Sequence, residues 1–245
     1  MPKTLPHAKT ECSNCSLREL CLPVGLQAND FEQLNTLIRQ SRRLKKGEYL
    51  FHSGEDFSAL FAIRTGFFKT AVTTQDGRDQ VTGFFMSGEL MGMDGIYSRH
   101  YTCDAVALED SDVCELPFDM MEELGKRLPA LQGHFMRMLS REIVRDQNVM
   151  LLLGNMRAEE RLAAFLLNLS QRLHLRGFAA NDFILRMSRE EIGSYLGLKL
   201  ETVSRTLSRF NQEGLIAVDH KHIRLIQPKV LQNMVSGCGN RSECA

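Results

Sequence analysis

The sequence predicts an α+β protein in which an N-terminal antiparallel β-roll is followed by a long helix and a C-terminal winged helix-turn-helix. Short β-branched and aromatic segments separated by glycines predict the roll. Apolar residues with helical spacing after Phe118 predict the long helix. Between Met187 and Ile226, a capped helix, a glycine turn, a second helix and a hairpin follow in the order of a winged helix-turn-helix.

We expect five segments along the chain. They are a cysteine-bearing cap at 1–30, the roll at 31–118, a dimerisation helix at 119–153, a DNA-binding domain at 154–228 and a tail at 229–245. The formal charge is −4 for residues 1–156 and +4 for residues 157–245, so the basic excess lies in the part expected to meet phosphates. The N-terminus lacks a secretory signal and no apolar stretch is long enough to span a bilayer, which predicts a cytoplasmic protein with no membrane segment.

The N-terminal half is expected to hold one helix and six strands. Helical spacing predicts a helix ending near Leu44 from the apolar residues Phe31, Leu34, Leu37 and Ile38. Asp76–Gly77 is a typical hairpin turn. The expected strands are Tyr49–His52, Ala59–Ile63, Phe67–Val72, Val81–Phe85, Asp104–Ala107 and Val113–Leu116.

The long helix after Phe118 carries an apolar seam with nearly heptad spacing, formed by Leu128, Leu131, Phe135, Met138, Val149 and Leu152. A helix of roughly 25 residues spans about 35 Å, which is more than a small roll covers. We therefore expect part of this helix to pair with a second subunit. The alternative is a helix that packs only on its own domain.

The helix-turn-helix pattern begins at Ser188 and Glu191, which form a capping box. Gly197 permits the turn, and Val203, Leu207 and Phe210 should face inward. The outward face is then formed by Glu201, Thr202, Ser204, Arg205, Ser208 and Arg209. Arg205 suits guanine and Glu201 suits cytosine, whereas Arg209 and Lys199 suit phosphate. The alternative is an ordinary helical hairpin with a solvated polar face.

Three cysteines lie within ten residues, with the spacing Cys12-x2-Cys15-x5-Cys21. In a reducing compartment such a cluster indicates metal or redox ligands rather than disulfides. Cys114 and Cys103 are the internal candidates for a fourth ligand. A four-thiolate zinc site and an iron–sulfur cluster both remain open from the residues alone. Cys238 and Cys244 lie in a Gly/Ser/Asn stretch that is more typical of an exposed end.

From about Cys12 to Leu225 the sequence resembles the fumarate and nitrate reduction regulator (FNR) group of the catabolite activator (CRP/FNR) superfamily. The matching runs are Cys12 to Pro23, Val113-Cys-Glu-Leu-Pro-Phe, Ala158-Glu-Glu-Arg-Leu-Ala-Ala-Phe, Ile192-Gly-Ser-Tyr-Leu-Gly-Leu and Glu201-Thr-Val-Ser-Arg. The resemblance implies that Cys12, Cys15, Cys21 and Cys114 hold a [4Fe–4S] cluster that oxygen dismantles. It also implies a homodimer that binds palindromic double-stranded promoter DNA and contacts RNA polymerase, governing aerobic and anaerobic gene expression.

The resemblance assigns further roles. Glu201, Ser204 and Arg205 would read bases, and Asp146 would oppose dimerisation unless the cluster is present; a solvated surface Asp146 is the alternative. The hairpin at Asp76, Gly77 and Arg78 would contact polymerase.

The roll resembles a cyclic-nucleotide-binding domain and contains Gly88-Glu-Leu, but no Arg-Ser or Arg-Thr pair follows to hold a cyclic phosphate. A small-ligand-sensing regulator is therefore the alternative function. An iron–sulfur enzyme or electron carrier is a third and is disfavoured, because a base-reading helix has no role in such chemistry.

Overall fold

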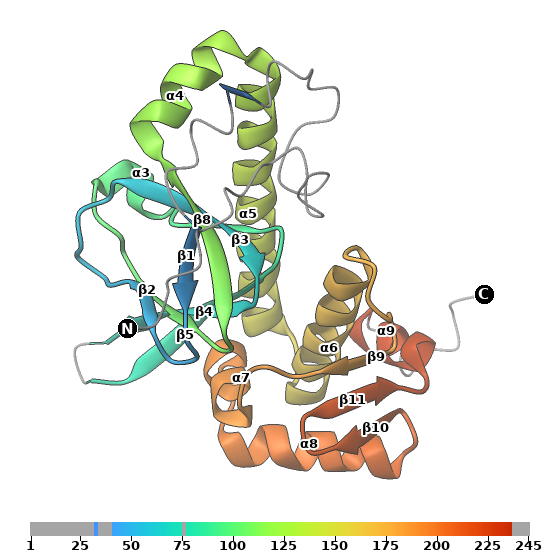
Figure 1. The fold of residues 1–245 in the computed structure, drawn as a ribbon. Helices are drawn as coiled ribbons and strands as arrows, with labels where there is room; N and C mark the ends of the chain where they lie inside the picture. The colour runs from blue at the N-terminus through green and yellow to red at the C-terminus, as the bar shows by residue number, and fades with distance from the viewer. Residues whose placement is uncertain (1–31, 34–40, 75–76, 237–245) are drawn as a thin grey trace, which may run out of the picture. The chain divides into compact units, whose positions relative to one another are not determined.

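Two antiparallel four-stranded sheets form the roll (Figure 1). The computed structural model describes residues 32–33, 41–74 and 77–236. One sheet has the order β1-β8-β3-β6, and the other has the order β2-β7-β4-β5. The bounds are β1 Ser41–Leu44, β2 Tyr49–Phe51, β3 Ala59–Thr65, β4 Phe67–Thr73, β5 Asp79–Met86, β6 Leu90–Met91, β7 Asp104–Ala107 and β8 Ser111–Pro117, with a short helix α3, Gly95–Ser98, after β6.

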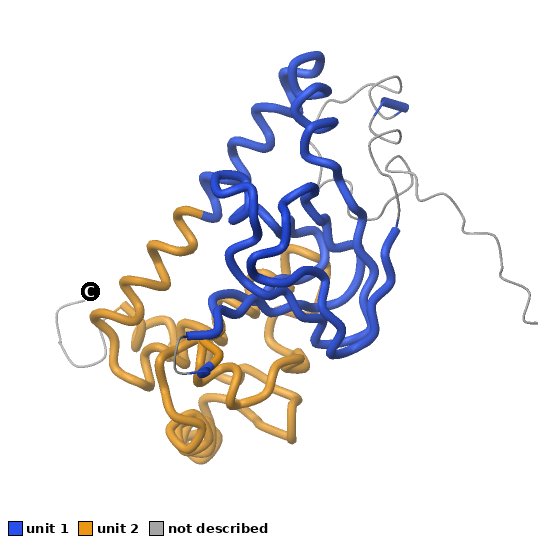
Figure 2. Tube along the Cα trace, turned by 90° about the vertical axis from the view of Figure 1, so that its left-hand side faces the viewer, with its two compact units in different colours: residues 1–78, 82–142 blue, residues 79–81, 143–245 orange. Residues whose placement is uncertain are grey.

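The chain divides into two compact units, residues 1–78 with 82–142 and residues 79–81 with 143–245 (Figure 2). The first unit has a core inside the roll in which Ile63, Phe68 and Val113 are fully buried. Their segments are rich in β-branched and aromatic residues, which favour strands because they pack well on a pleated, half-buried surface.

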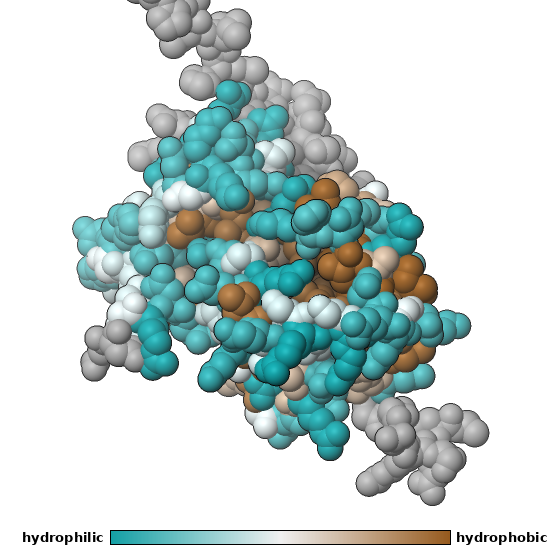
Figure 3. Space-filling model, turned by 90° about the horizontal axis from the view of Figure 1, so that it is seen from below, coloured by the Kyte–Doolittle hydropathy of each residue, from teal (hydrophilic) through white to brown (hydrophobic). Residues whose placement is uncertain are grey.

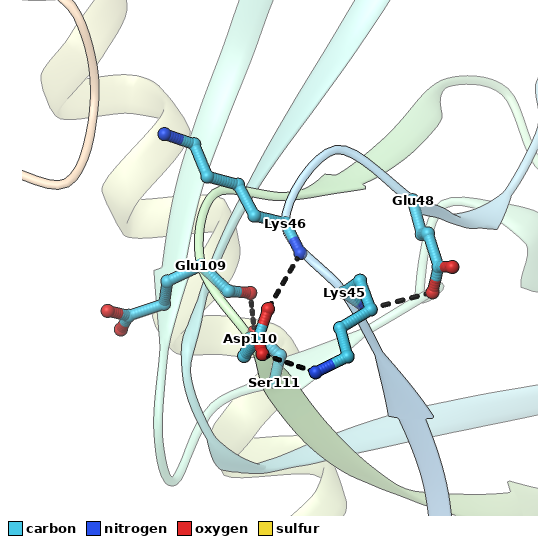
Figure 4. Close-up of polar contacts among 6 residues, drawn as sticks. All are labelled: Lys45, Lys46, Glu48, Glu109, Asp110 and Ser111. Carbon is cyan, nitrogen blue, oxygen red and sulfur yellow. Dashed lines mark hydrogen bonds and ion pairs between the residues drawn. The ribbon is translucent and has the colours of Figure 1, made fainter.

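A surface ion pair joins two turns of the roll (Figure 4). Lys45 Nζ lies 2.7 Å from Asp110 Oδ2, and the Lys46 N–H donates to Asp110 Oδ1 at 3.1 Å. The hydrogen bond between Lys45 and Asp110 raises the lysine pKa and lowers the aspartate pKa. Both side chains are solvent-exposed, so this pair contributes little to stability and mainly fixes the turn between β7 and β8.

The six expected strands are confirmed, with ends that shift by one or two residues. The expectation of a helix extending to Leu44 is wrong over its last four residues. Ser41–Leu44 form β1, which pairs with β8 and buries Leu44, because pairing with an existing strand outweighs local helical spacing. The apolar residues on which that helix rested, Phe31, Leu34, Leu37 and Ile38, lie outside the described residues.

The helical region after the roll is divided in two. Helix α4, Phe118–Arg127, ends before Pro129, and α5, Pro129–Asn155, continues for 27 residues. Leu128 between them has φ −120° and ψ 86°, because a residue before proline avoids the helical region. Among the residues that the structure describes, no helix has the length and apolar character needed to cross a membrane.

The second unit contains the C-terminal part of α5, four further helices and a three-stranded sheet of order β10-β11-β9. Sequence reasoning missed β9 and α9, which are short; α9 begins at a proline and buries Leu231 at the start of the expected tail. The bounds are α6 Ala158–His174, β9 Asp182–Ile184, α7 Arg189–Leu196, α8 Leu200–Gln212, β10 Ile216–Asp219, β11 His222–Leu225 and α9 Pro228–Val235.

Gly193 in α7 packs directly against the turn that follows this helix. A Cβ there would lie 2.6 Å from the Leu198 carbonyl oxygen, so Gly193→Ala should destabilise the protein by about 1–3 kcal/mol despite the better helix propensity of alanine. Gly154→Ala is the matched control, since nothing lies within 4 Å of its Cβ position. That control should be neutral or stabilising by up to about 1 kcal/mol. Urea unfolding measures both, and equal stabilities would contradict the close packing.

Candidate functional site

The turn between α7 and α8 has the geometry that the sequence predicts. The Ser188 N–H donates to Glu191 Oε2 at 2.7 Å, and the Glu191 N–H donates to Ser188 Oγ at 3.1 Å, which confirms the capping box. Gly197 ends α7 with φ 63°, a conformation that glycine adopts at no steric cost. The Leu198 N–H then donates to the Gly193 carbonyl at 2.8 Å. These contacts set the angle at which α8 leaves the turn.

Helix α8 has one buried and one accessible face. Val203, Leu207 and Phe210 are at most 1% exposed, so they hold the helix against the core of its unit. The opposite face carries Glu201 and Arg205, which are exposed, and Thr202 and Ser204, which are partly exposed. The structure thus brings these four predicted residues together at the N-terminal end of α8, where a recognition helix contacts base edges.

Arg209 differs from the other predicted DNA-binding residues because its guanidinium has carboxylate partners. Its Nη2 lies 3.0 Å from Glu159 Oε1, and its Nε lies 3.6 Å from Glu213 Oε1. A phosphate contact by Arg209 would therefore compete with two acids of the same unit. The sequence pattern did not reveal this, because Glu159 is 50 positions away.

The hairpin after α8 confirms the predicted wing, with Ile216 paired to Leu225 and Asp219 to His222. Beneath it, Asp182 of β9 accepts hydrogen bonds from His222 and, at 2.9 Å, from Arg224 Nε. These two bonds lower the pKa of Asp182. Because β9 was not expected, sequence reasoning missed this support for the wing.

A hollow of about 370 Å³ lies between α7, α8 and the wing. Most of its lining residues are polar. They include Arg189 of α7 and His220 in the turn of the wing. Of the polar lining residues, the sequence predicted only Ser208 to face outward, and it gave no role to Arg189, Asn211, Gln212 and His220. The one sequence feature that could have indicated this hollow is the cation of Arg189 directly after the capping serine.

The two internal cysteines occupy different environments. Cys114 lies on β8 opposite Ser41 of β1 and Ala62 of β3, and it is 9% exposed. Since Val113 packs into the roll core, the alternation of a strand places Cys114 on the other face of the sheet. Cys12, Cys15 and Cys21 lie outside the described residues, as do Cys238 and Cys244.

Cys103 belongs to the roll core itself. Its thiol donates to Asp94 Oδ2 at 3.5 Å. Burial raises the pKa of this thiol strongly, and the negative charge of Asp94 raises it further. Cys103 is therefore packed inside the core, with Asp94 as its hydrogen-bond partner.

Aromatic side chains pack around Tyr101 in the interior of the roll. Tyr101 stacks on Phe51 with ring centroids 4.0 Å apart, and its hydroxyl donates to the Ala59 carbonyl at 2.8 Å. The Thr102 N–H donates to Asp94 at 2.7 Å, within the stretch that lacks the Arg-Ser or Arg-Thr pair needed to hold a cyclic phosphate. This arrangement disfavours the small-ligand alternative.

Helix α5 has two apolar faces. Phe135 and Met138 pack against the roll core, so this part of the predicted seam is covered by the roll of the same chain. Met136, Ile143 and Met150 are 60%, 58% and 65% exposed and lie seven residues apart, which places them in one exposed stripe. Asp146 is exposed and belongs to this stripe, three residues after Ile143. Apolar residues also interrupt the hydrophilic surface elsewhere, as Figure 3 shows for one face.

The turn between β4 and β5 is the region predicted to contact RNA polymerase. The Gly77 N–H donates to the Thr74 carbonyl at 2.8 Å, and the Thr74 N–H donates to the Arg78 carbonyl at 2.9 Å. Gly77 has φ 77° and Arg78 is exposed, whereas Asp76 lies outside the described residues.

Comparisons with known proteins agree with this architecture. Residues 41–127 match the cyclic nucleotide-binding domain family, and residues 160–234 match the Crp-like helix-turn-helix domain family. A roll of this kind followed by a winged helix-turn-helix defines a DNA-binding transcription regulator of the catabolite activator type.

Individual relatives narrow the class. The chain is 46% identical over 235 residues to the transcriptional activator protein anr of Pseudomonas aeruginosa, with 96% of each chain covered. It is 44% identical over 214 residues to the fumarate and nitrate reduction regulatory protein of Escherichia coli, covering 87% of this chain and 86% of that one. The structure of FixK2 from Bradyrhizobium japonicum is 29% identical with a TM-score of 0.73, covering 80% and 96%. The chain belongs to the FNR group of the CRP/FNR superfamily, and it is a transcription regulator rather than an enzyme.

Proposed function

We propose that this regulator responds to oxygen, binding palindromic promoter DNA as a homodimer while a [4Fe–4S] cluster on Cys12, Cys15, Cys21 and Cys114 is intact. The observation that carries the proposal is the position of Cys114 beside β1. Ser41, its partner across the ladder, follows Cys21 by 20 residues, and a chain of that length reaches up to about 66 Å. The N-terminal trio is thus within reach of the Cys114 thiol.

The residues fit a four-thiolate site. Cys114 sits on a strand paired on both sides, so its position is fixed, while the other three ligands come from one short segment. Such a site would supply a redox-sensitive iron–sulfur core that oxygen degrades. Cys103 is a poor fourth ligand because its thiol is buried in the core and hydrogen-bonded to Asp94.

Dimerisation would use the exposed stripe of α5. Met136, Ile143 and Met150 are too exposed for a helix that packs only on its own unit, and burying them against a second copy would be favourable. Two Asp146 carboxylates near a symmetric seam would repel each other. A rearrangement that depends on the cluster would then decide between monomer and dimer.

DNA reading would fall to the N-terminal end of α8. Arg205 has the donors for guanine O6 and N7, Glu201 accepts from cytosine N4, and Ser204 and Thr202 suit base edges. Arg209 would bind phosphate only at the expense of its pairs with Glu159 and Glu213. RNA polymerase would contact the turn at Asp76, Gly77 and Arg78, and the exposure of Gly77 and Arg78 suits a protein contact. A cytoplasmic location follows from a promoter target.

Protein purified without air tests the ligand set. Wild type and Cys103→Ala should each hold roughly four irons and four sulfides per chain, whereas Cys114→Ala should lose them while its C-terminal unit stays folded. Iron and sulfide analysis with visible absorption measures this. Retention of the cluster in Cys114→Ala, or a colourless wild type carrying zinc, would contradict the proposal.

Base reading by Arg205 is tested by substitution. Arg205→Ala should cost about 1–3 kcal/mol of affinity for a specific palindrome and much less for unrelated DNA, with iron content unchanged. Arg209→Ala serves as the comparison, and its loss should be small and equal on both DNAs. Fluorescence anisotropy at fixed salt measures all four affinities. An equal loss on both DNAs for Arg205→Ala would make that residue a phosphate contact.

A further inference from the structure

The side chain of Arg161 in α6 contacts three separate points of the backbone around it. Its Nη2 donates to the Leu153 carbonyl at 2.7 Å, and its Nε donates to the Met156 carbonyl at 2.9 Å. Its Nη1 donates to the Leu196 carbonyl at 3.0 Å. One guanidinium therefore joins the end of α5, the link to α6 and the end of α7.

These acceptors are groups that need such a partner. The last four carbonyls of a helix have no donor within that helix, and Leu153 and Leu196 belong to the last turns of α5 and α7. The carbonyl end of a helix also attracts a cation, and Arg161 serves two of these ends together. A guanidinium has a rigid fork of five N–H groups, so three bonds fix both the distance and the angle between these helix ends.

The same place is closely packed on the side of the helix-turn-helix. A Cβ added to Gly197, the residue that ends α7, would lie 3.4 Å from Arg161 Nη1 and 3.5 Å from Leu153 Cδ2. The turn that directs α8 therefore rests on the guanidinium and on α5. All of these residues belong to one compact unit, into which α5 continues.

We propose that Arg161 is a positioning residue, which fixes the direction of the helix-turn-helix relative to the end of α5. The inference rests on the proposed dimerisation through α5. In such a dimer, each α8 takes its direction from its own α5, so Arg161 sets the separation between the two recognition helices. It thereby determines which spacing of half-sites the dimer accepts, while making no contact with bases.

This role differs from general stabilisation in what it predicts. Loss of stability would weaken binding to every DNA in proportion. Loss of positioning would leave a single half-site bound normally and would weaken only the preference for one spacing. That preference exists because the second recognition helix binds intramolecularly, which adds on the order of 100-fold in affinity when the geometry allows it.

The test uses full-length protein with its cluster, prepared without air, and a half-site selected from random duplexes by the wild type. Three palindromes carry that half-site at the selected spacing and at one base pair more and less, and a fourth duplex carries one half-site. Arg161→Lys keeps the charge but replaces the fork with a single ammonium. Arg161→Gln is the second variant. Arg176→Lys is the control, since its guanidinium donates at 2.5 Å to the Arg172 carbonyl at the far end of α6.

Wild type and Arg176→Lys should prefer the selected spacing by roughly 100-fold, and Arg161→Lys should lower that preference at least about tenfold. Its single half-site affinity should stay within about twofold of wild type. An unchanged preference in an Arg161 variant that still binds the half-site overturns the inference. So does a parallel loss on all four duplexes in both variants. If wild type itself shows no preference, the proposed dimer fails, and the inference fails with it.

Discussion

Strand β8 pairs with a neighbour on both sides, and this pairing fixes the position of Cys114, on which the proposed cluster site depends. Strand β8 hydrogen-bonds to β1 on one edge and to β3 on the other, so each of its side chains has a fixed place. Val113 fills the roll core, and Cys114 faces the opposite side next to the strand by which the N-terminal segment joins the roll. The same strand ends at Pro117, directly before α4. Cys114 is therefore close in sequence to α4, the helix that precedes α5.

Helix α5 links the two compact units because it is continuous through both of them. Its first half packs on the roll through Phe135 and Met138, and its last turn is held by Arg161. The exposed stripe of Met136, Ile143 and Met150, to which Asp146 belongs, runs along another face of the same helix. The stripe through which we propose that two copies pair therefore lies on a helix that belongs to both units.

Much of this architecture was predictable from local patterns. The strands, the capping box at Ser188 and the wing follow from glycine turns, side-chain caps and apolar spacing, which are properties of neighbouring residues. The features that escaped prediction depend on distant partners. Ser41–Leu44 form a strand because they pair with β8. Strand β9 forms because it pairs with β11, with Phe183 opposite Ile223.

The candidate site divides in the same way. Helical spacing predicted which residues of α8 face outward, but it could not predict that Arg209 meets Glu159 or that Cys103 is held in the core by Asp94. Nor could it separate the two apolar faces of α5, because that separation depends on where the roll lies against the helix. Arg161 lies in one of the runs that resemble the family, but its contacts could not be predicted, since its three acceptors are backbone carbonyls that any residue supplies.

We propose that an intact cluster holds two copies together, and sedimentation distinguishes this from pairing that does not need the cluster. Protein purified without air should sediment as a brown dimer. After measured exposure to oxygen, the loss of iron–sulfur absorbance should be matched by conversion to monomers in the same samples. A mass that stays constant while the absorbance disappears would show that the cluster does not hold the dimer together.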